Sequence, residues 1–268
     1  KLQKKTIDYI KSNYTYYYIE KNIFNQLSKE KVLIVGDTII DKFIFTKNLG
    51  MSGKEAIRTV EKISEKKLVG GVIAVANTVS NFVKKVDLIT AMGENKNDQN
   101  FCKKNLKSNI KLKKKILRNV PTTEKSKIIN VTTNQKLLGI YNFNDKQLSN
   151  LNNTKLKKLF KKSLKNKNFG IILDYGHGLF NRKFAKLILS NRKKNFYFNT
   201  QINAANYGYH TIGKYEKAKF AVINEVELRH EMRDRISEIE ILIKLMSKKL
   251  EINTLVVTAG TKGSYAYS

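Results

Sequence analysis

The sequence contains very little cysteine, proline or tryptophan: one Cys, one Pro and no Trp in 268 residues. A single cysteine, Cys102, cannot form an internal disulfide or a cysteine metal cluster, which excludes disulfide scaffolds and zinc ribbons. No apolar run reaches the ~18 residues that a membrane-spanning helix needs, and the first residues lack the apolar stretch of a signal peptide. These absences predict a cytoplasmic protein with no membrane partner. With 41% apolar residues, the chain can bury the core of one or two domains.

Acidic residues are also scarce, since 22 Asp and Glu face 52 Lys and Arg, which gives a net charge of +30. A basic protein attracts nucleic acids and anionic membranes. However, only seven of these residues are Arg, and the lysines are spread along the whole chain. Nucleic-acid-binding domains are expected to concentrate Arg and aromatic residues on one surface. The densest lysine cluster, 155–167, has apolar residues at helical spacing and is interpreted as a helix with a solvated face. We therefore expect no specific nucleic-acid partner.

The pattern of apolar residues predicts an α/β fold. Residues 1–30 show no clear period and are interpreted as a lead-in or a linker from an upstream segment. From residue 31 to 268, apolar strands alternate with amphipathic helices, which is typical of a mostly parallel central sheet. Strands are predicted at 32–35, 86–91, 111–117, 169–173, 196–198, 220–223 and 254–258, and helices at 72–83, 98–106, 148–164, 182–189, 225–235 and 236–250.

Two stretches interrupt this alternation, one within about 41–69 and one within about 122–143. Both contain half-polar alternating segments that are interpreted as strands with no helix between them. Such strands do not fit the core of a doubly wound sheet. They predict a small separate sheet that forms a lid or a contact between two copies of the chain.

The first candidate site residues follow the first strand. Asp37 and Asp41 lie where ligands bind in open α/β sheets, and each carboxylate could accept hydrogen bonds from two sugar hydroxyls. A turn-capping role explains an Asp there equally well. Gly70 and Gly71 precede a predicted helix and could bring backbone N–H groups close to a ligand, or could simply form a tight turn. The chain has no GxGxxG motif, which disfavours NAD.

The loop Asp174-Tyr175-Gly176-His177-Gly178 follows another buried strand. Two glycines and two ionisable side chains in one loop indicate a segment that faces a substrate or nucleotide phosphates. His177 could act as a base, but a hydrogen-bonded loop histidine is the favoured interpretation.

Two motifs near the C-terminus can each be explained either by ligand binding or by local structure. Asn224 and Glu227, three apart at a helix start, could orient water molecules around Mg²⁺, and the same pair is a typical helix cap. Thr258, Gly260 and Gly263 follow the last long strand. Their hydroxyl and amide groups could receive a polyphosphate, although many glycine-rich turns have this composition.

In their order along the chain, these motifs resemble the ribokinase/PfkB carbohydrate kinase family. The resemblance runs from about residue 31 to 267. The narrower likeness is to the heptose 7-phosphate kinases, which include the kinase domain of bifunctional kinase–nucleotidyltransferases. It is carried by the Gly-Asp-x-x-x-Asp start, the Pro-Thr-Thr-x-Lys strand from Pro121 to Lys125, and the Asp-Tyr-x-x-Gly loop from Asp174 to Gly178.

The resemblance implies a three-layer α/β/α domain with a β lid that often forms a homodimer. It implies transfer of the ATP γ-phosphate to a sugar or sugar-phosphate hydroxyl, with Mg²⁺. The implied substrate-binding residues are Asp37, Asp41, Gly70, Gly71, Asp174 and, toward a substrate phosphate, Lys125 and Lys127. The implied nucleotide-binding residues are Asn224, Glu227, Thr258, Gly260 and Gly263, of which Asn224 and Glu227 would also hold the metal through water.

Three departures from the family pattern limit this expectation. The Gly-Ala-Gly-Asp element that supplies the catalytic base would lie beyond Ser268, so this chain alone is expected to have little or no kinase activity. Ala74 replaces an Asn that many heptose kinases carry after the glycine pair. The residues from Phe198 to Gln201 replace an expected Asp-Pro-Lys. The sequence therefore does not predict which sugar is the substrate. The alternative function is that of a noncatalytic module that binds a sugar or a nucleotide.

Overall fold

The computed structural model describes residues 8, 22–143, 150–165, 167–191, 193–204, 206–207 and 210–268. Most of the lead-in predicted at 1–30 lies outside the described residues, as do the first two residues of the helix predicted at 148–164. The described part of the lead-in contains the short helix α2 (Asn25–Leu27). Within the described chain, no helix is both long enough and apolar enough to cross a membrane.

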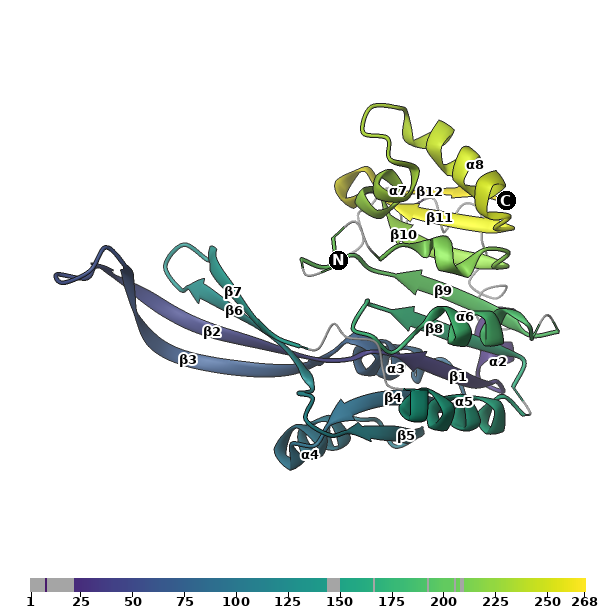
Figure 1. Ribbon diagram of the computed structural model, residues 1–268, viewed down its shortest axis with the longest axis horizontal. Coiled ribbons are helices and arrows are strands. Elements are labelled where there is room, and N and C mark those ends of the chain that lie inside the picture. Colours follow the sequence, from purple (N-terminus) through teal and green to yellow (C-terminus); the bar gives the residue numbers. More distant parts are fainter. Residues whose placement is uncertain are drawn as a thin grey trace.

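In the described residues, eight strands form the central sheet, in the order β12-β11-β10-β9-β8-β1-β4-β5 (Figure 1). All neighbouring strands are parallel except β11 and β12. This confirms the predicted α/β class. The strands are β1 (Lys31–Gly36), β4 (Lys85–Gly93), β5 (Ile110–Leu117), β8 (Phe169–Asp174), β9 (Asn195–Thr200), β10 (Phe220–Asn224), β11 (Thr254–Thr258) and β12 (Ser264–Tyr267).

Helices cover both faces of this sheet and confirm the three-layer arrangement. Strand β1 shows why, because its side chains alternate between two separate cores: Val32 and Ile34 pack in one, Leu33 and Val35 in the other. A strand buried on both faces is a continuous apolar run, which is the signal in the sequence. The helices are α3 (Gly71–Val79), α4 (Lys96–Lys104), α5 (Asn150–Leu164), α6 (Arg182–Leu189), α7 (Glu225–Met232) and α8 (Ile239–Leu250).

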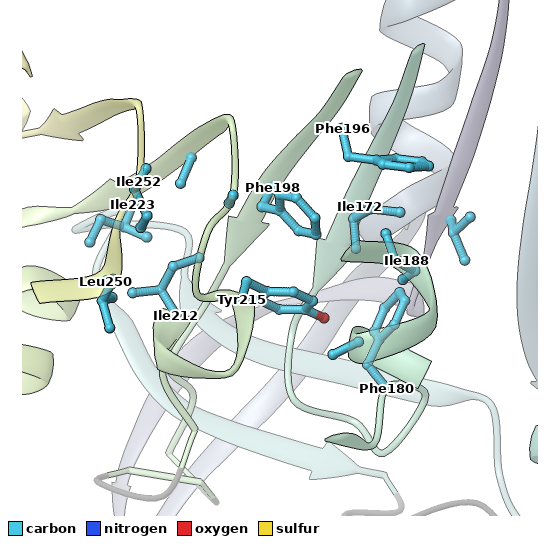
Figure 2. Close-up of a cluster of buried hydrophobic side chains, with 14 of the residues drawn as sticks. Ile172, Phe180, Ile188, Phe196, Phe198, Ile212, Tyr215, Ile223, Leu250 and Ile252 are labelled. Atoms are coloured by element: carbon cyan, nitrogen blue, oxygen red, sulfur yellow. The ribbon is translucent and has the colours of Figure 1, made fainter. Parts of the chain in front are cut away.

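The larger core lies under α5, α6 and α8 and is rich in aromatic side chains (Figure 2). Phe198 of β9 packs against Tyr215, with ring centroids 4.6 Å apart. Tyr215 belongs to η2 (Ile212–Tyr215), a single 3₁₀ turn between β9 and β10. The Tyr215 ring is fully buried while its hydroxyl reaches toward the end of β8, so this core also helps to position the site described below.

The remaining long strands of the described chain form a second, four-stranded sheet in the order β3-β2-β6-β7. Its strands are β2 (Thr38–Met51), β3 (Arg58–Gly70), β6 (Thr123–Asn130) and β7 (Lys136–Asn142). This sheet projects from the α/β body as a long arm (Figure 1). The predicted lid sheet is therefore present. It begins at Thr38, directly after Asp37, and Asp41 lies on its first strand.

The helix boundary predicted between residues 235 and 236 is wrong. Helix α7 ends at Met232, Arg233 takes a left-handed conformation with φ of 54°, and α8 begins only at Ile239. The Asp234 carboxylate accepts the backbone N–H groups of Ile236 and Ser237, which stabilises a turn instead of a helix. Ile236 consequently points into solvent and is 92% exposed.

Candidate active site

The predicted site residues gather at the carboxyl ends of the central strands. From β1 the chain adds β4 and β5 on one side, whereas β8 to β11 lie on the other side. The order of strands therefore reverses between β1 and β8, and ligands of open α/β sheets bind in the crevice at such a point. Asp37 follows β1 and Asp174 ends β8, so these two carboxylates flank the crevice.

Asp37 is fixed by both its backbone and its side chain. Its carbonyl accepts the N–H of Val72 at the start of α3, and its Oδ2 accepts the N–H of Tyr175 at 2.9 Å. The side chain is only 5% exposed. Burial, followed by the nearby Asp174 carboxylate, raises the pKa of Asp37 to about 7. Asp37 can therefore exist in either protonation state near neutral pH.

The two glycines of the β3–α3 junction fit closely against Asp37 and Asp41. Gly71 has φ of 53°, and a Cβ at this position would overlap the Asp37 carbonyl oxygen. A Cβ at Gly70 would overlap the Asp41 carboxylate. The structure thus brings Asp37, Asp41, Gly70 and Gly71 together, and the absence of side chains at the two glycines is what makes the approach possible.

Two lysines of the lid lie beside Asp41. Lys127 on β6 forms an ion pair with Asp41 at 3.4 Å and lies over the Phe43 ring. Lys125 is the register partner of Asp41 and lies over the Tyr141 ring, 5.7 Å from its centroid. Among the described residues the Lys125 ammonium forms no ion pair. Burial lowers the pKa of Lys125, and the charges of Asp41 and Asp37 partly oppose that shift.

Asp174 is enclosed by the protein rather than open to the crevice. Its carboxylate is 1% exposed and contacts Lys214 at 2.5 Å, the Tyr215 hydroxyl at 2.7 Å and the N–H of Gly176 at 3.1 Å. His210 lies 3.4 Å from the same carboxylate. These contacts hold the Asp174–Gly178 loop beside Asp37. Direct contact between Asp174 and a substrate stays a prediction.

His177 of this loop lines a small cavity. The cavity measures about 30 Å³, and its polar lining residues are Asp37, Thr38, Thr122, Thr123 and His177. Both ring nitrogens of His177 are buried without a hydrogen-bond partner in the described structure. Burial, followed by the charge of Lys125, lowers the pKa of His177 to about 4, so the ring is neutral at neutral pH. The interpretation of His177 as a hydrogen-bonded loop histidine is wrong for its side chain.

A second group of predicted residues lies at the ends of β10 and β11. Asn224 and Thr258 are register partners on these strands. Asn224 also caps α7: its Oδ1 accepts the N–H of Glu227, and Glu227 Oε2 accepts the N–H of Asn224, both at 2.8 Å. Glu227 Oε1 accepts the N–H of Ile202 at 3.1 Å. Burial raises the pKa of Glu227.

These contacts limit how Asn224 and Glu227 could hold Mg²⁺. Each oxygen of the buried Glu227 carboxylate already accepts a backbone N–H, so the pair fits a metal through bound water rather than by direct coordination. In the part of the chain that the structure describes, no group of three or more His, Cys, Asp or Glu side chains could hold a metal ion. Asn224 and Glu227, the pair predicted to hold Mg²⁺, are thus also the residues that cap α7.

The glycines after β11 differ from those of the β3–α3 junction. Gly260 and Gly263 have φ of 58° and 91°, yet a Cβ at either position would meet no atom within 4 Å. They permit a turn, closed by a hydrogen bond from Ala259 N–H to the Gly263 carbonyl at 2.8 Å, that opens onto free space. The group around Asp37, after β1, and the group around Asn224, at the end of β10, are separated by three strand spacings of ~4.8 Å. The two groups therefore lie about 14 Å apart along the edge of the central sheet.

Sequence reasoning missed the residues that hold Asp174 in place. Lys214, Tyr215 and His210 come from the segment between β9 and β10, where no helix or strand is predicted. The spacing of the apolar residues Ile212 and Tyr215 matches a single helical turn, which is too short to stand out. The pairing of this turn with the end of β8 is visible only in three dimensions.

The family model described as pfkB family carbohydrate kinase matches residues 29–268. Among curated proteins, the bifunctional protein HldE of a Nitratiruptor species is 23% identical over 245 residues. That match covers 88% of this chain and 49% of HldE, so the chain spans about half the length of this relative.

Two solved structures show the same fold. Phosphofructokinase-2 from Escherichia coli in complex with fructose-6-phosphate superposes with a TM-score of 0.68 at 11% identity, over 90% of this chain and 77% of that chain. Ribokinase from Thermotoga maritima gives a TM-score of 0.62 at 15% identity, over 89% of this chain and 75% of that chain.

Proposed function

Because the chain belongs to the pfkB family of carbohydrate kinases, we propose that it forms the sugar- and nucleotide-binding part of an ATP-dependent kinase with a phosphorylated sugar as its acceptor. The substrate class that we assign is a heptose 7-phosphate or a closely related sugar phosphate. The reaction is the transfer of the ATP γ-phosphate to a hydroxyl of this sugar. ATP and sugar phosphates are metabolites of the cytoplasm, which is where we place the reaction.

The observation that carries the acceptor assignment is the position of the lid lysines. Lys125 and Lys127 lie on the same strand as Thr123, a residue of the cavity wall. Lys127 is paired with Asp41, and Lys125 forms no ion pair in the described structure. Carboxylates suit the hydroxyls of a sugar, and two adjacent ammonium groups suit its phosphate. An unphosphorylated sugar would leave Lys125 half-buried and without an ion-pair partner in the described structure.

The nucleotide is assigned to the open end of the sheet edge. Thr258, Gly260 and Gly263 would receive the phosphates of ATP, and Asn224 and Glu227 would orient the water shell of Mg²⁺. When bound, Mg²⁺ supplies charge neutralisation to those phosphates. The proposal assigns the catalytic base to a Gly-x-Gly-Asp element following Ser268, where the Asp would take the proton of the sugar hydroxyl.

The test is turnover by the protein expressed from its complete gene, measured as ADP release against a panel of sugar phosphates and free sugars. We expect turnover with a sugar phosphate, and a KM that rises about tenfold in Lys125→Met because a charge-assisted contact is lost. Lys136→Met, which removes an exposed lysine of the same lid, is the matched control. If the protein binds a sugar phosphate without releasing ADP, the noncatalytic module replaces the kinase.

We also propose that two copies associate through the lid. In the lid, the apolar side chains of Leu138 and Ile140 are 58% and 52% exposed, which is unusual for a sheet that faces only water. A structure of Escherichia coli phosphofructokinase-2 is described as a tetrameric inhibited form. Light scattering after size-exclusion chromatography should give a dimer mass that Ile140→Lys converts to a monomer mass. A monomer in the unmodified protein contradicts this proposal.

A further inference from the structure

The backbone of the Asp174–Gly178 loop places His177 in the wall of the cavity that Asp37 also lines. The N–H of Tyr175 donates to Asp37 Oδ2, and the backbone of His177 also faces this carboxyl. The Asp174 network holds the base of the same loop. His177 thus lies on a fixed loop, and it lines the same cavity as Thr122 and Thr123.

The three histidines of the chain differ in what their rings contact. His210 Nε2 lies 3.1 Å from the Asp174 carbonyl, and the His230 ring packs edge-on against Tyr207. The His177 ring packs against Phe143 in a tilted arrangement, with ring centroids 5.8 Å apart, yet both of its nitrogens are buried and unpaired in the described structure. Burial of unpaired polar atoms destabilises a fold. A polar ring in this state at a cavity wall indicates that its partner is a ligand.

The chemistry of the ring narrows the class of that partner. A neutral imidazole has one N–H donor and one nitrogen acceptor. A phosphate offers only acceptors at its ionised oxygens, so it can use one of the two nitrogens. A sugar hydroxyl both donates and accepts, as the ring does. The neighbouring Lys125 and the burial of the ring both disfavour the imidazolium that would suit an anion better.

We propose that His177 is a substrate-binding residue that exchanges hydrogen bonds with a hydroxyl group of the sugar, beside the Asp37 carboxyl. Within the same site, Lys125 then faces the substrate phosphate, while His177 forms hydrogen bonds with a hydroxyl of the sugar. The inference rests on the proposed function, because it requires that a sugar phosphate binds in this crevice.

The test is nitrogen-detected NMR of the histidine side chains in the unmodified protein. With only three histidines in the chain, each ring is assigned by its single substitution. A heptose 7-phosphate, fructose 6-phosphate and inorganic phosphate are titrated separately. We expect a binding sugar phosphate to shift the ring nitrogens of His177, while those of His230 stay unchanged. Inorganic phosphate should leave His177 unchanged.

Binding measured by calorimetry provides an independent readout. His177→Phe keeps the ring and removes both nitrogens, so we expect it to weaken the binding of the sugar phosphate about tenfold. His177→Asn keeps a donor and an acceptor and should recover part of this loss. His230→Phe is the matched control and should bind as the unmodified protein does. Thermal unfolding of each variant confirms that it is folded.

The outcomes separate this inference from the proposed function. If a sugar phosphate binds with normal affinity to His177→Phe, or binds without moving the His177 signals, the inference is overturned and the kinase proposal stands. Equal shifts of His177 with inorganic phosphate would also overturn it, because the ring would then be a phosphate ligand. If no sugar phosphate in the panel binds at all, both the proposed function and this inference fail.

Discussion

The two ends of the candidate site are built differently, although both lie on the same edge of one sheet. At the end that we propose for the sugar, called the sugar end below, Asp37 and Asp174 are 5% and 1% exposed. There Gly70 lies against the Asp41 carboxylate, and Gly71 lies against the Asp37 carbonyl oxygen. At the end that we propose for the nucleotide, called the nucleotide end below, Asn224 and Thr258 are exposed and the glycines that follow β11 face open space. The difference teaches that the sugar end is part of the core, so a change there alters stability and ligand binding together.

The largest effect should come from the buried network around Asp174. Lys214→Met removes the cation that pairs with Asp174 and leaves the carboxylate buried, with only neutral donors and His210 near it. Breaking such a pair from one side costs about 3 kcal/mol. The control is Lys217→Met, whose pair with Glu251 is 62% and 66% exposed. We expect that control to lose less than about 1 kcal/mol.

Unfolding in urea, followed by circular dichroism, measures both losses. Equal losses in the two variants would mean that Asp174 does not depend on Lys214 for its charge balance. The buried ion pair of Asp174 would then contribute no more to stability than an exposed ion pair on the protein surface.

The two glycines with nearly the same left-handed conformation give the next comparison. Gly71 and Gly260 have φ of 53° and 58°. An Ala at either position takes an unfavourable backbone conformation, which costs about 1–2 kcal/mol. Only at Gly71 does the new Cβ also overlap a backbone atom, the Asp37 carbonyl oxygen.

We therefore expect Gly71→Ala to lose at least about 1 kcal/mol more than Gly260→Ala, because backbone atoms cannot move aside cheaply. The two midpoints of urea unfolding report the difference. A smaller loss in Gly71→Ala than in Gly260→Ala would show that the junction is loosely packed.

The sequence predicts the fold well because the signals of the central strands are local. Each central strand is an apolar run, and the predicted helix 182–189 and the strand 254–258 match α6 and β11 residue for residue. The lid is predictable for the same reason, since its alternation of polar and apolar residues is visible along the chain. The start of α8 is not, because the Asp234 turn replaces helical hydrogen bonds that the pattern alone would allow.

The candidate site is predictable only in part, because its members meet through tertiary contacts. Strand ends place Asp37, Asp174, Asn224 and Thr258 on one edge, as parallel topology requires. No sequence pattern shows that Lys214 reaches Asp174 or that the His177 ring lacks a partner in the described structure. The burial of side chains at the sugar end, which distinguishes it from the nucleotide end, arises from tertiary packing.

The sugar end should also respond to pH through Asp37. Its pKa is about 7 in the folded protein against 3.8 for an ordinary Asp carboxyl, so the folded state holds a proton that the unfolded state has released. Between pH 3.8 and about pH 7 the free energy of unfolding should fall as pH rises, and above about pH 7 the stabilisation from Asp37 is lost. From pH 5 to 8 the change attributable to Asp37 is on the order of 2 kcal/mol.

Other groups around Asp37 titrate in the same interval. His177 and His210 have lowered pKa values, so their contribution to stability rises with pH up to about 6.5 and opposes that of Asp37. Lys214 and Asp174 add charges beside them. The difference in unfolding free energy between the unmodified protein and Asp37→Asn isolates Asp37, because the histidines are common to both. A difference that does not change from pH 5 to 8 would contradict the raised pKa.

The smallest effect on stability should come from Gly70, and it tests whether enclosure at the sugar end serves binding. Gly70 has φ of −115°, which Ala adopts without strain, and a new Cβ would meet the Asp41 carboxylate, the movable end of a side chain. We expect Gly70→Ala to lose less than about 1 kcal/mol of stability while it turns Asp41 away from the crevice. Calorimetry should show the affinity for a sugar phosphate falling about tenfold. In an Asp41→Ala background the same Gly70→Ala change should have no further effect, because the carboxylate that it displaces is already absent. Additive losses in the double variant would mean that Gly70 contacts the ligand itself, and the glycine pair would then act on the sugar directly rather than through Asp41.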